Sequence, residues 1–485
     1  MRLEKLLNNR YPLDPSLREW NIESISCDSR DVKQNSLFVA LKGANFNGAN
    51  FIPEAIQRGA RVIAASEEIK FPLSKDVWLL RVDDSLGFLQ EVVRRFYGNP
   101  SKEVRTIGVT GTNGKTTITY LLESVFQHVH KRCAVMGTIN YRMGPKIFPA
   151  RNTTPGLVEN QTFLSQLAQE HFDYCAMEVS SHALDQGRVD LIDFTTGIFT
   201  NLTSDHLDYH LTRENYFQAK AKLFTRLASS ATAVINTDDL FGQRLLSMTQ
   251  ARGLTYGIKN NAGWKAENIQ LSLGGTEFKL IHPKGENSFR TPFVGIYNVY
   301  NVLAVIAACC AEGMDLESVQ EGISHFHGVP GRLERVEAGQ DFSIFIDYAH
   351  TQDALENVLK TLRQVSGSKI IVVFGCGGNR DKSKRPLMGR TAGQWADYCV
   401  VTSDNPREED PQEIIDQILP GLQNEHYTVI VDRREAIEHA LGLAREGDIV
   451  LIAGKGHEDY QVLKDKRIPF KEKDIVREYL QCLPR

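Results

Sequence analysis

Short apolar runs rich in β-branched residues recur along the chain and alternate with stretches of helical periodicity. Such runs are typical of strands buried on both faces of a parallel sheet, with helices between them covering the two faces. The pattern therefore predicts an α/β protein. The expected strands are residues 36–41, 60–65, 77–82, 104–110, 174–179, 195–200, 232–236, 370–374, 398–402, 428–431 and 448–453.

Two segments depart from this pattern. Between about 250 and 295 polar and apolar positions alternate, and residues 269–273 and 276–281 are joined by Gly274-Gly275. Two alternating runs with a short glycine loop between them are typical of a β-hairpin. Residues 300–311 are apolar all round, which predicts a buried helix. We therefore expect a small antiparallel annex followed by that helix.

The chain is long enough for two to four domains, since a domain commonly has about 100–200 residues. The pattern breaks at Asn99-Pro100-Ser101 and again around His327-Gly328-Val329-Pro330-Gly331. We predict three domains: a small α/β domain over 1–98, a central domain with a parallel sheet and the annex over 99–328, and a Rossmann-like, doubly wound domain over 329–485.

Composition excludes several classes of protein. The 485 residues carry 56 Lys and Arg against 60 Asp and Glu, a net charge of −4, and 42% are hydrophobic. These values argue against a disordered chain and against a nucleic-acid partner. The eight cysteines contain no Cys-x-x-Cys pair, which favours free thiols in a reducing compartment over disulfides or zinc. No apolar segment resembles a signal core or reaches the ~20 residues of a membrane helix, so we expect a cytoplasmic protein without membrane insertion.

The strand predicted over 104–110 runs directly into Gly111-Thr112-Asn113-Gly114-Lys115-Thr116-Thr117 and a helix over 118–129. Strand, glycine loop and helix in this order are typical of a phosphate-binding unit, in which backbone N–H groups, a lysine and a hydroxyl face the phosphates and Mg²⁺. The full G-x-x-x-x-G-K-[ST] pattern is absent, because its first glycine would fall on Val109. The shorter G-x-x-G-K-T form nevertheless predicts a central domain of the P-loop type that binds nucleotide.

Polar residues follow later strands of the same domain, where open α/β sheets place their ligands. Thr116, Glu178 and His206 could supply oxygen ligands and one imidazole to a hard cation that bridges phosphates. Each of the three taken alone could equally be a surface-loop residue, but their shared topological position favours a common site. On composition alone, Lys220 is expected to be a solvated helix lysine.

Segments from about 104 to 458 resemble the Mur ligases of peptidoglycan synthesis in order and spacing, and folylpolyglutamate synthases share some of them. They are Gly111–Thr117, Met177–His182, Thr200–His210, Gly295–Asn298 with Asn301, Pro330–Glu334 and Asp347–His350. Four further segments are similar to the family branch that adds the third amino acid: Asn152–Pro155, Gly375–Lys382, Asp404–Arg407 and Gly454–Glu458. The N-terminal domain is similar less densely, through Asp28–Arg30 and Leu37–Ala40.

The resemblance implies an ATP-dependent ligase that adds meso-2,6-diaminopimelate to the D-Glu γ-carboxylate of UDP-MurNAc-L-Ala-D-Glu through an acyl phosphate. ATP, Mg²⁺ and a carbamate formed from CO₂ on Lys220 are the cofactors it implies. The first domain would bind uridine, the central one ATP and metal, and the third the amino acid. We expect a monomer.

The resemblance also implies roles for individual residues. Catalysis would rest on Lys115, Glu178, His206 and Lys220. Metal would be held by Thr116, Glu178, His206 and the N6-carboxylated Lys220. ATP would contact Gly111, Thr112, Asn113, Gly114, Lys115, Thr116, Thr117, Asn298, Asn301, Arg332, Asp347 and His350. The UDP-MurNAc-dipeptide would contact Ser29, Asn152, Thr153, Thr154, Ser180, Gln186 and Arg188. Diaminopimelate would contact Arg380, Asp404, Asn405, Pro406, Arg407, Gly454 and Glu458.

Asn379 departs from the family, which often has Asp at that position, and leaves the affinity for the amino acid open.

Two other readings of the chain remain. A ligase on the same scaffold could add L-lysine, or glutamate to folate, but lysine-adding relatives lack an arginine at the position of Arg407, and a folate enzyme needs no uridine domain. A P-loop NTPase of non-synthetic role would release phosphate without the UDP-dipeptide or an amino acid.

Overall fold

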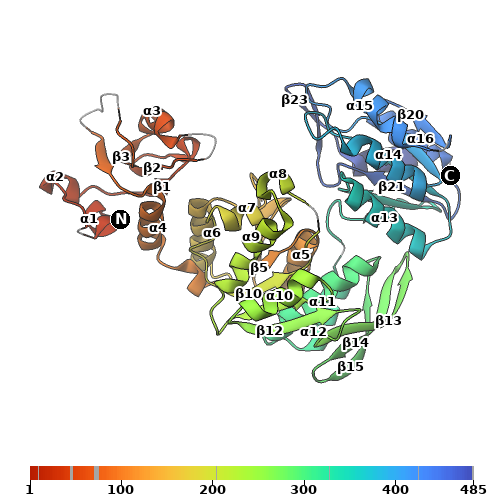
Figure 1. Cartoon of the computed structure of the whole chain (residues 1–485), viewed down its shortest axis with the longest axis horizontal. Coiled ribbons are helices and arrows are strands. Elements are labelled where there is room, and N and C mark those ends of the chain that lie inside the picture. Colours follow the sequence, from red (N-terminus) through yellow and green to blue (C-terminus); the bar gives the residue numbers. More distant parts are fainter. Residues whose placement is uncertain are drawn as a thin grey trace. The chain divides into compact units, whose positions relative to one another are not determined.

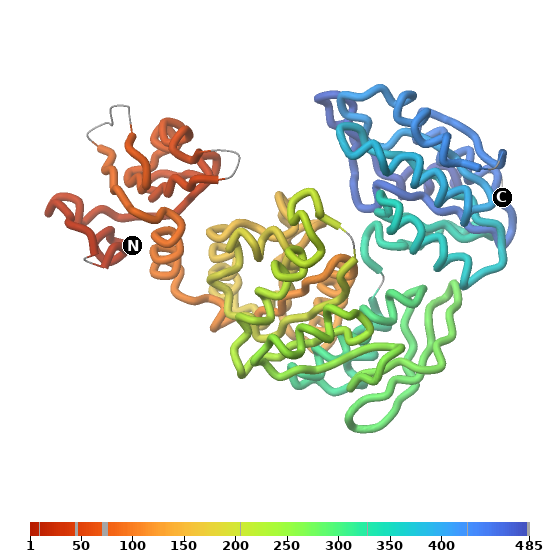
Figure 2. The backbone as a smooth tube through the Cα atoms, in the orientation of Figure 1, coloured from red at the N-terminus to blue at the C-terminus, as the bar shows by residue number. Residues whose placement is uncertain are grey.

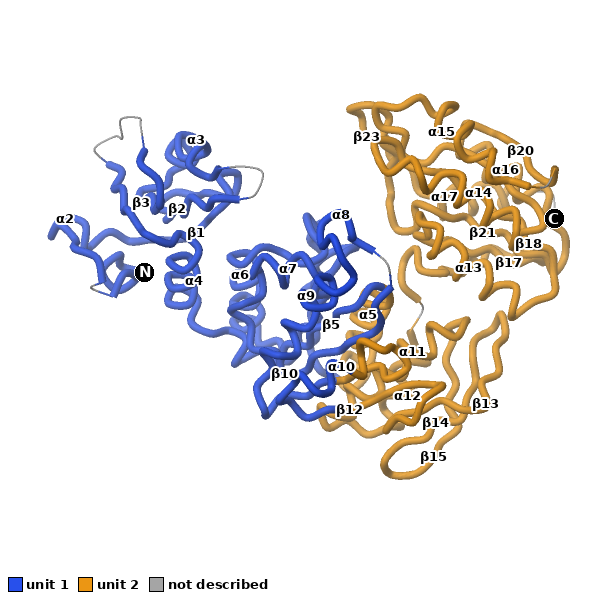
Figure 3. The backbone as a smooth tube through the Cα atoms, viewed as in Figure 1, with its two compact units in different colours: residues 1–112, 130–233, 244–253 blue, residues 113–129, 234–243, 254–485 orange. Residues whose placement is uncertain are grey.

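The computed structural model describes residues 1–8, 10–43, 47–69, 76–203, 205–326, 328–423 and 425–482 (Figures 1 and 2). His327, which belongs to the second predicted boundary, lies outside these residues. The chain divides into two compact units, shown in Figure 3. Unit 1 comprises residues 1–112, 130–233 and 244–253, and unit 2 comprises residues 113–129, 234–243 and 254–485. The predicted domain limits 98/99 and 328/329 stay predictions.

The N-terminal part of unit 1 is built on a parallel four-stranded sheet of order β1-β2-β3-β4. Helix α4 shows why it packs there: Phe88, Leu89, Val92 and Val93 form one apolar stripe that is buried, and the Asp84 side chain caps the helix start by accepting from Leu86 N. The elements are α1 (Leu3–Leu7), α2 (Pro15–Arg18), β1 (Ser24–Ser26), η1 (Ser29–Asp31), β2 (Ser36–Ala40), η2 (Gly48–Phe51), α3 (Ile52–Gln57), β3 (Ala60–Ala65), β4 (Trp78–Arg81) and α4 (Ser85–Tyr97).

The central sheet has the order β15-β14-β13-β12-β11-β10-β5-β9-β6-β7-β8. Its middle strands β10, β5, β9 and β6 pair in parallel, so their carboxyl ends share one edge. The strands are β5 (Arg105–Thr110), β6 (Cys133–Met136), β7 (Asn140–Met143), β8 (Lys146–Pro149), β9 (Tyr174–Glu178), β10 (Phe194–Phe199), β11 (Thr232–Asn236), β12 (Arg252–Gly257), β13 (Trp264–Ser272), β14 (Gly275–His282) and β15 (Gly285–Thr291).

The helices of this region include α5, which follows β5 directly, and α11, which is apolar on nearly every face and almost entirely buried. The latter confirms the buried helix predicted over 300–311, although it begins four residues earlier. The helices are η3 (Pro100–Lys102), α5 (Lys115–His128), α6 (Leu157–Gln169), α7 (Ser181–Asp185), α8 (Leu207–His210), α9 (Arg213–Thr225), α10 (Leu240–Met248), α11 (Ile296–Ala311) and α12 (Leu316–Ser324).

The C-terminal part of unit 2 contains a sheet of order β16-β17-β21-β18-β19-β20, in which only the edge pair β16–β17 is antiparallel. This is the doubly wound architecture expected from the repeated strand–helix pattern. The elements are β16 (Glu334–Val336), β17 (Ser343–Asp347), α13 (Gln352–Val365), β18 (Ile370–Phe374), α14 (Lys384–Trp395), β19 (Tyr398–Val401), α15 (Pro411–Ile418), η4 (Leu419–Gly421), β20 (Tyr427–Val429), α16 (Arg433–Leu443), β21 (Ile449–Ala453), β22 (Tyr460–Leu463), β23 (Lys466–Pro469) and α17 (Glu472–Cys482).

The observed elements confirm the predicted α/β class and the antiparallel annex. The hairpin is β13–β14, with Ser272 paired to Gly275, so its loop lies one residue earlier than expected. The pattern missed the short strands β1, β6 and β16, the buried strand β17, and the hairpins β7–β8 and β22–β23, whose strands have four residues each. No helix in the described part of the chain is both long and apolar enough to cross a bilayer.

Candidate functional site

The segment after β5 forms the predicted phosphate loop. Gly111 has φ 148°, and a Cβ atom there would overlap Thr200 Oγ1, so only glycine fits. Thr112 is held from both directions: its N–H donates to Asn201 O at 2.8 Å, and its hydroxyl accepts from Thr203 N at 3.0 Å. Helix α5 then begins at Lys115, where the first backbone N–H groups have no partner within the helix and attract anions. The predicted order of strand, loop and helix is confirmed.

Lys220 contradicts the expectation drawn from composition, because it is 1% exposed rather than solvated. The long side chain lies beneath the loop: its Nζ donates to Gly111 O at 2.9 Å and sits 4.5 Å from the ring centroid of Tyr216. The hydroxyl of Tyr216 lies 3.3 Å from Thr112 Oγ1. The prediction failed because α9 is buried along most of its faces. Its sequence carries four charged residues, and such a helix is expected to be mostly exposed.

Glu178 ends β9 and is 1% exposed. Both carboxylate oxygens are occupied by one residue, since Thr138 N donates to Oε1 at 2.9 Å and Thr138 Oγ1 donates to Oε2 at 3.0 Å. Gly137 lies against the same carboxylate so closely that a Cβ atom there would overlap Oε1. The carboxylate is therefore fixed at the carboxyl edge of the sheet, where β5 also ends.

Three imidazoles gather near the start and end of α8. His206 has φ 55° and a half-exposed side chain, 5.0 Å between ring centroids from His182. His210 is buried, 2.9 Å from Ser181 Oγ and 5.4 Å from the ring of His182. Burial lowers the pKa of both His182 and His210. Neutral rings beside His206 limit the positive charge at this point of unit 1.

Five of the residues expected to hold the UDP-MurNAc-dipeptide form one hydrogen-bonded cluster in unit 1: Thr154, Ser180, Gln186, Arg188, and Thr153, which joins it through Thr138 and Glu178. Arg188 donates through Nε to Gln186 Oε1 at 2.9 Å and through Nη1 to Thr154 O at 3.2 Å. Thr154 Oγ1 donates to Glu178 O and accepts from Ser180 N. Thr153 Oγ1 lies 3.1 Å from Thr138 Oγ1, and Asn152 O accepts from Tyr141 Oη. Ser29 is in η1, where its hydroxyl donates to Glu54 Oε2 at 2.7 Å.

A metal site made of protein side chains alone is not formed: within the described ranges, no three His, Cys, Asp or Glu residues are placed to hold an ion. Mg²⁺ commonly keeps several waters and binds through one or two protein oxygens plus phosphates, so it needs no such cage. The fixed Glu178 and the half-exposed His206 in unit 1, and the buried Thr116 in unit 2, each offer a group that suits that open kind of coordination.

The residues expected to contact ATP beyond the loop lie in two places in unit 2. Asn298 and Asn301 are on one face of α11, joined by a bond of 3.1 Å from Asn301 Nδ2 to Asn298 Oδ1. Asp347 ends β17 and accepts from Leu333 N and Ala349 N, and burial raises its pKa to about 6 although the charge of Arg332 opposes this. The structure records no hydrogen bond between these two places among the described residues.

Arg332 and His350 lie near the end of β17. The guanidinium of Arg332 lies 5.1 Å from the ring of Tyr348, and its buried Nε has no hydrogen-bond partner in the described part of the chain. His350 Nδ1 is 2.8 Å from Tyr348 O. An unsatisfied buried donor of this kind is costly unless a ligand acceptor reaches it.

The residues expected to bind the amino acid meet around the loop after β19. Asn405 Nδ2 donates to Glu458 Oε2 at 2.8 Å, and Gly454 is so close to Asp404 that a Cβ atom would lie 2.6 Å from Oδ2. Asp404 is buried, and its Oδ2 has no hydrogen-bond partner among the described residues. This carboxylate oxygen is suited to accept from an amine.

Arg407 has φ 54°, and the backbone is held there by two bonds, from Arg407 N to Val462 O of β22 and from Lys464 N, which follows β22, to Arg407 O. Its Nη1 donates to Gly378 O at 2.7 Å. The exposed Arg380 belongs to the same glycine loop, since Arg407 Nη1 and Arg380 Cγ both border the Cβ position of Gly377. The Arg407 guanidinium and the stem of Arg380 therefore border the same glycine.

Sequence reasoning missed the residues that hold these loops in place. Arg385 is fully buried and pairs with Glu409, whose pKa falls to about 2 because Arg385 donates to it. Arg433 is fully buried, pairs with Glu472, and donates to Ala453 O at 2.8 Å. Lys455 is also fully buried. The sequence around these three residues gives no local signal that they are buried, because partners such as Glu409, Glu472 and Asn405 lie far along the chain.

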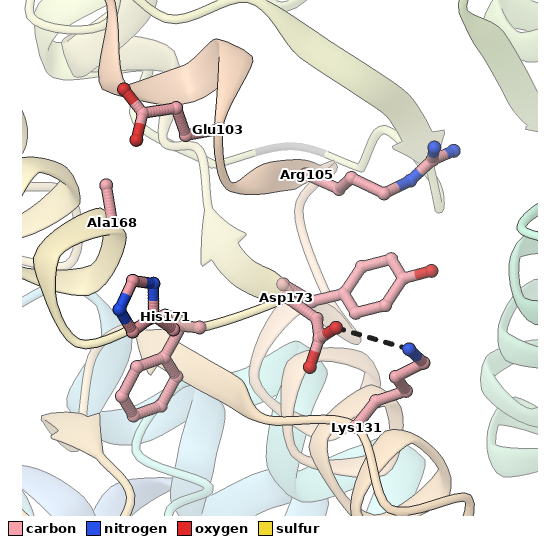
Figure 4. Close-up of a pocket in the computed structure, with 8 residues that line it drawn as sticks. Glu103, Arg105, Lys131, Ala168, His171 and Asp173 are labelled. Carbon is pink, nitrogen blue, oxygen red and sulfur yellow. Dashed lines mark hydrogen bonds and ion pairs between the residues drawn. The ribbon is translucent and has the colours of Figure 1, made fainter.

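A cavity of about 410 Å³ lies elsewhere in unit 1, at the amino ends of β5, β6 and β9 (Figure 4). Lys131 and Asp173, 3.3 Å apart, form an ion pair in its wall. Ligands of open α/β sheets bind at the opposite edge, where Gly111 and Glu178 lie. The cavity is lined by Glu103, Arg105, Lys131, Ala168, His171, Phe172, Asp173 and Tyr174.

The fold and the loop define a three-domain α/β protein of the phosphate-loop class. Three family models match the chain: "Mur ligase family, catalytic domain" over 21–97, "Mur ligase middle domain" over 109–309 and "Mur ligase, glutamate ligase domain" over 331–456. The chain belongs to the Mur ligase family, as the sequence motifs suggested.

Two proteins similar to this chain over nearly its full length carry the name UDP-N-acetylmuramoyl-L-alanyl-D-glutamate--2,6-diaminopimelate ligase. The protein of that name from Geobacillus kaustophilus is 44% identical and is matched over 94% of each chain, and that from Syntrophomonas wolfei is 41% identical over 99% of each. A solved structure with the same name is 34% identical over 99% of both chains, with a TM-score of 0.71.

Proposed function

We propose that this protein is the ATP-dependent ligase that joins meso-2,6-diaminopimelate to the D-Glu γ-carboxylate of UDP-MurNAc-L-Ala-D-Glu, giving the tripeptide product, ADP and phosphate. The observation that supports it most directly lies in the loop Asp404–Arg407, which carries the Arg407 guanidinium and the buried Asp404 Oδ2, an oxygen without a hydrogen-bond partner among the described residues. Diaminopimelate carries a carboxylate and an ammonium at each end, so it needs both kinds of group. The names of the full-length relatives agree with this chemistry.

The chain's own residues account for phosphoryl transfer as charge neutralisation and positioning. The loop after β5 directs backbone N–H groups at the phosphates, and Lys115 adds a point charge at the start of α5. Asn298, Asn301, Arg332, Asp347 and His350 remain proposed contacts of ATP. Mg²⁺, when bound, would neutralise charge on the transferred phosphoryl group, with Thr116, Glu178 and His206 as its proposed ligands.

The dipeptide carboxylate must lie where the phosphoryl group can reach it. The cluster of Thr154, Ser180 and Arg188 adjoins Glu178 through the bond from Thr154 Oγ1 to Glu178 O, and thus links the proposed substrate residues to the proposed metal ligand. Arg188 can answer substrate carboxylate or diphosphate charge. Once the acyl phosphate forms, the amine of the amino acid attacks the carbonyl carbon and phosphate leaves.

The proposed carbamate on Lys220 fits the geometry beneath the loop. Carbamylation adds CO₂ to a neutral amine and leaves one N–H on the nitrogen, so the bond from Lys220 Nζ to Gly111 O can persist after modification. The modification replaces a cation with an anionic oxygen ligand. Surrounding groups that disfavour the charged amine would assist it, since only the neutral amine reacts.

Phosphate release from ATP tests the proposed function. The assay contains UDP-MurNAc-L-Ala-D-Glu and compares meso-diaminopimelate, L-lysine and no amino acid. We expect release only with both substrates, and much faster release with diaminopimelate than with lysine. Equal rates with L-lysine would indicate the lysine-adding reaction, and release without either substrate would indicate an NTPase of non-synthetic role.

A further inference from the structure

A fully buried lysine lies within the proposed amino-acid pocket. Lys455 is 0% exposed and stands between Gly454 and Glu458, in the segment from β21 to β22. Burial of an ammonium group costs free energy unless hydrogen-bond acceptors surround it. The acceptors around Lys455 therefore indicate the role of this lysine.

Two of those partners are pocket residues. Lys455 Nζ donates to Asn405 Oδ1 at 3.1 Å and to Glu458 Oε2 at 3.2 Å, and it lies 5.5 Å from the ring centroid of Tyr460. The side chain is therefore a cross-link between the loop after β19 and the loop after β21.

These contacts determine how the Asn405 amide is oriented. Its Oδ1 receives two donors, Lys455 Nζ and Val462 N, neither of which can accept a hydrogen bond. The amide nitrogen must then face the other way, and it donates to Glu458 Oε2 at 2.8 Å. Without the lysine, one of the two donors to Asn405 Oδ1 is lost.

The same contacts leave the two oxygens of the Glu458 carboxylate in different environments. Oε2 accepts from both Lys455 and Asn405, whereas Oε1 has no hydrogen-bond partner among the described residues. One oxygen is anchored and the other is available to a ligand.

We propose that Lys455 is a positioning residue for amino-acid selection. It anchors Glu458 Oε2 and the Asn405 amide so that Glu458 Oε1 is presented to the ammonium group of the incoming amino acid. This inference rests on the proposed function, because it requires that the pocket receives diaminopimelate. Lys455 itself need not touch the substrate.

The test uses the full-length Lys455→Met variant, which keeps the side-chain length and removes the charge. Lys466→Met is the matched control, since Lys466 is an exposed lysine of the adjacent β22–β23 hairpin. KM and kcat are measured by phosphate release for each of the three substrates. We expect the KM for diaminopimelate to rise about tenfold or more in Lys455→Met, with kcat and the KM values of ATP and the UDP-dipeptide within about threefold of wild type. The control should be unchanged.

Two more variants separate positioning from general stability. Lys455→Gln can still donate a hydrogen bond, so it should recover part of the lost affinity. In a double-mutant cycle with Glu458→Gln, removing Lys455 should add little to the KM for diaminopimelate, because both changes act on the same carboxylate.

An unchanged KM for diaminopimelate, additive effects in the cycle, or a parallel rise in all three KM values would overturn the proposal. So would loss of folded protein in both Lys455 variants, seen by thermal unfolding, since that would indicate a purely structural role. If the wild type does not use diaminopimelate at all, the proposed function fails. If Arg407→Ala impairs diaminopimelate use and Lys455→Met does not, only this inference fails.

Discussion

Replacing Arg407 by alanine should reduce the use of diaminopimelate far more than the binding of ATP. One edge of the guanidinium is already engaged, because Nη1 donates to Gly378 O at 2.7 Å. Among the described residues Nε and Nη2 have no partner, so the other edge can grip a carboxylate with two parallel bonds. The backbone of Arg407 stays in place through its bonds with Val462 of β22 and with Lys464, which follows that strand.

The size of the effect follows from those bonds. A hydrogen bond to a charged group contributes about 1.5–3 kcal/mol, so losing the bidentate grip should cost roughly 3 kcal/mol. Since about 1.4 kcal/mol corresponds to a factor of ten, kcat/KM for diaminopimelate should fall about 100-fold. Alanine and arginine suffer similar strain at φ 54°, so the free energy of unfolding should change by no more than about 1 kcal/mol, mostly from the lost bond to Gly378.

Steady-state phosphate release with each substrate varied in turn measures this prediction. Arg407→Lys keeps the charge but loses the planar fork, and we expect it to fall between wild type and Arg407→Ala. Arg390→Ala, a change of an exposed arginine on α14, is the matched control. An unchanged KM for diaminopimelate in Arg407→Ala, with kcat also unchanged, would refute the assignment of this pocket.

Three other substitutions test separate parts of the structure. Gly137→Ala places a Cβ atom against Glu178 Oε1 and should lower kcat at least about tenfold without unfolding the protein, as checked by circular dichroism and phosphate release. Lys220→Ala should abolish turnover, and short carboxylic acids should restore part of it if a carbamate is the active form; full activity without rescue would contradict the carbamate. Arg433→Met leaves the buried Glu472 without its cation and should destabilise the protein by about 3–5 kcal/mol, visible as a lower Tm in calorimetry.

The buried strands were predictable because their signal is local. Residues 62–65, 233–235 and 370–374 are continuous apolar runs, and they lie within β3, β11 and β18. The phosphate loop was predictable for a similar reason, since strand, glycines, lysine and helix follow one another directly. Periodicity reports burial well when a whole element is apolar.

Lys220 and Lys455 were not predictable because their burial depends on distant partners. Lys220 bonds to Gly111, more than a hundred residues earlier, and Lys455 bonds to Asn405, fifty residues earlier. A charged side chain can be buried only where acceptors meet it, and the sequence around it does not say which acceptors those are. The roles of such residues follow from tertiary contacts alone.

The same reasoning explains the departure at Asn379. This residue has φ 52°, a left-handed conformation in which asparagine is favoured over most residues. Its Oδ1 accepts from Glu408 N at 3.1 Å, and its own N–H donates to Glu409, the carboxylate that also pairs with Arg385. An aspartate could make the same bond with Glu408 N, but it would add a negative charge beside two glutamates. The neutral amide of Asn379 therefore avoids repulsion with Glu408 and Glu409 while it holds the loop that carries Arg380. The cationic groups of the proposed amino-acid site remain the guanidinium groups.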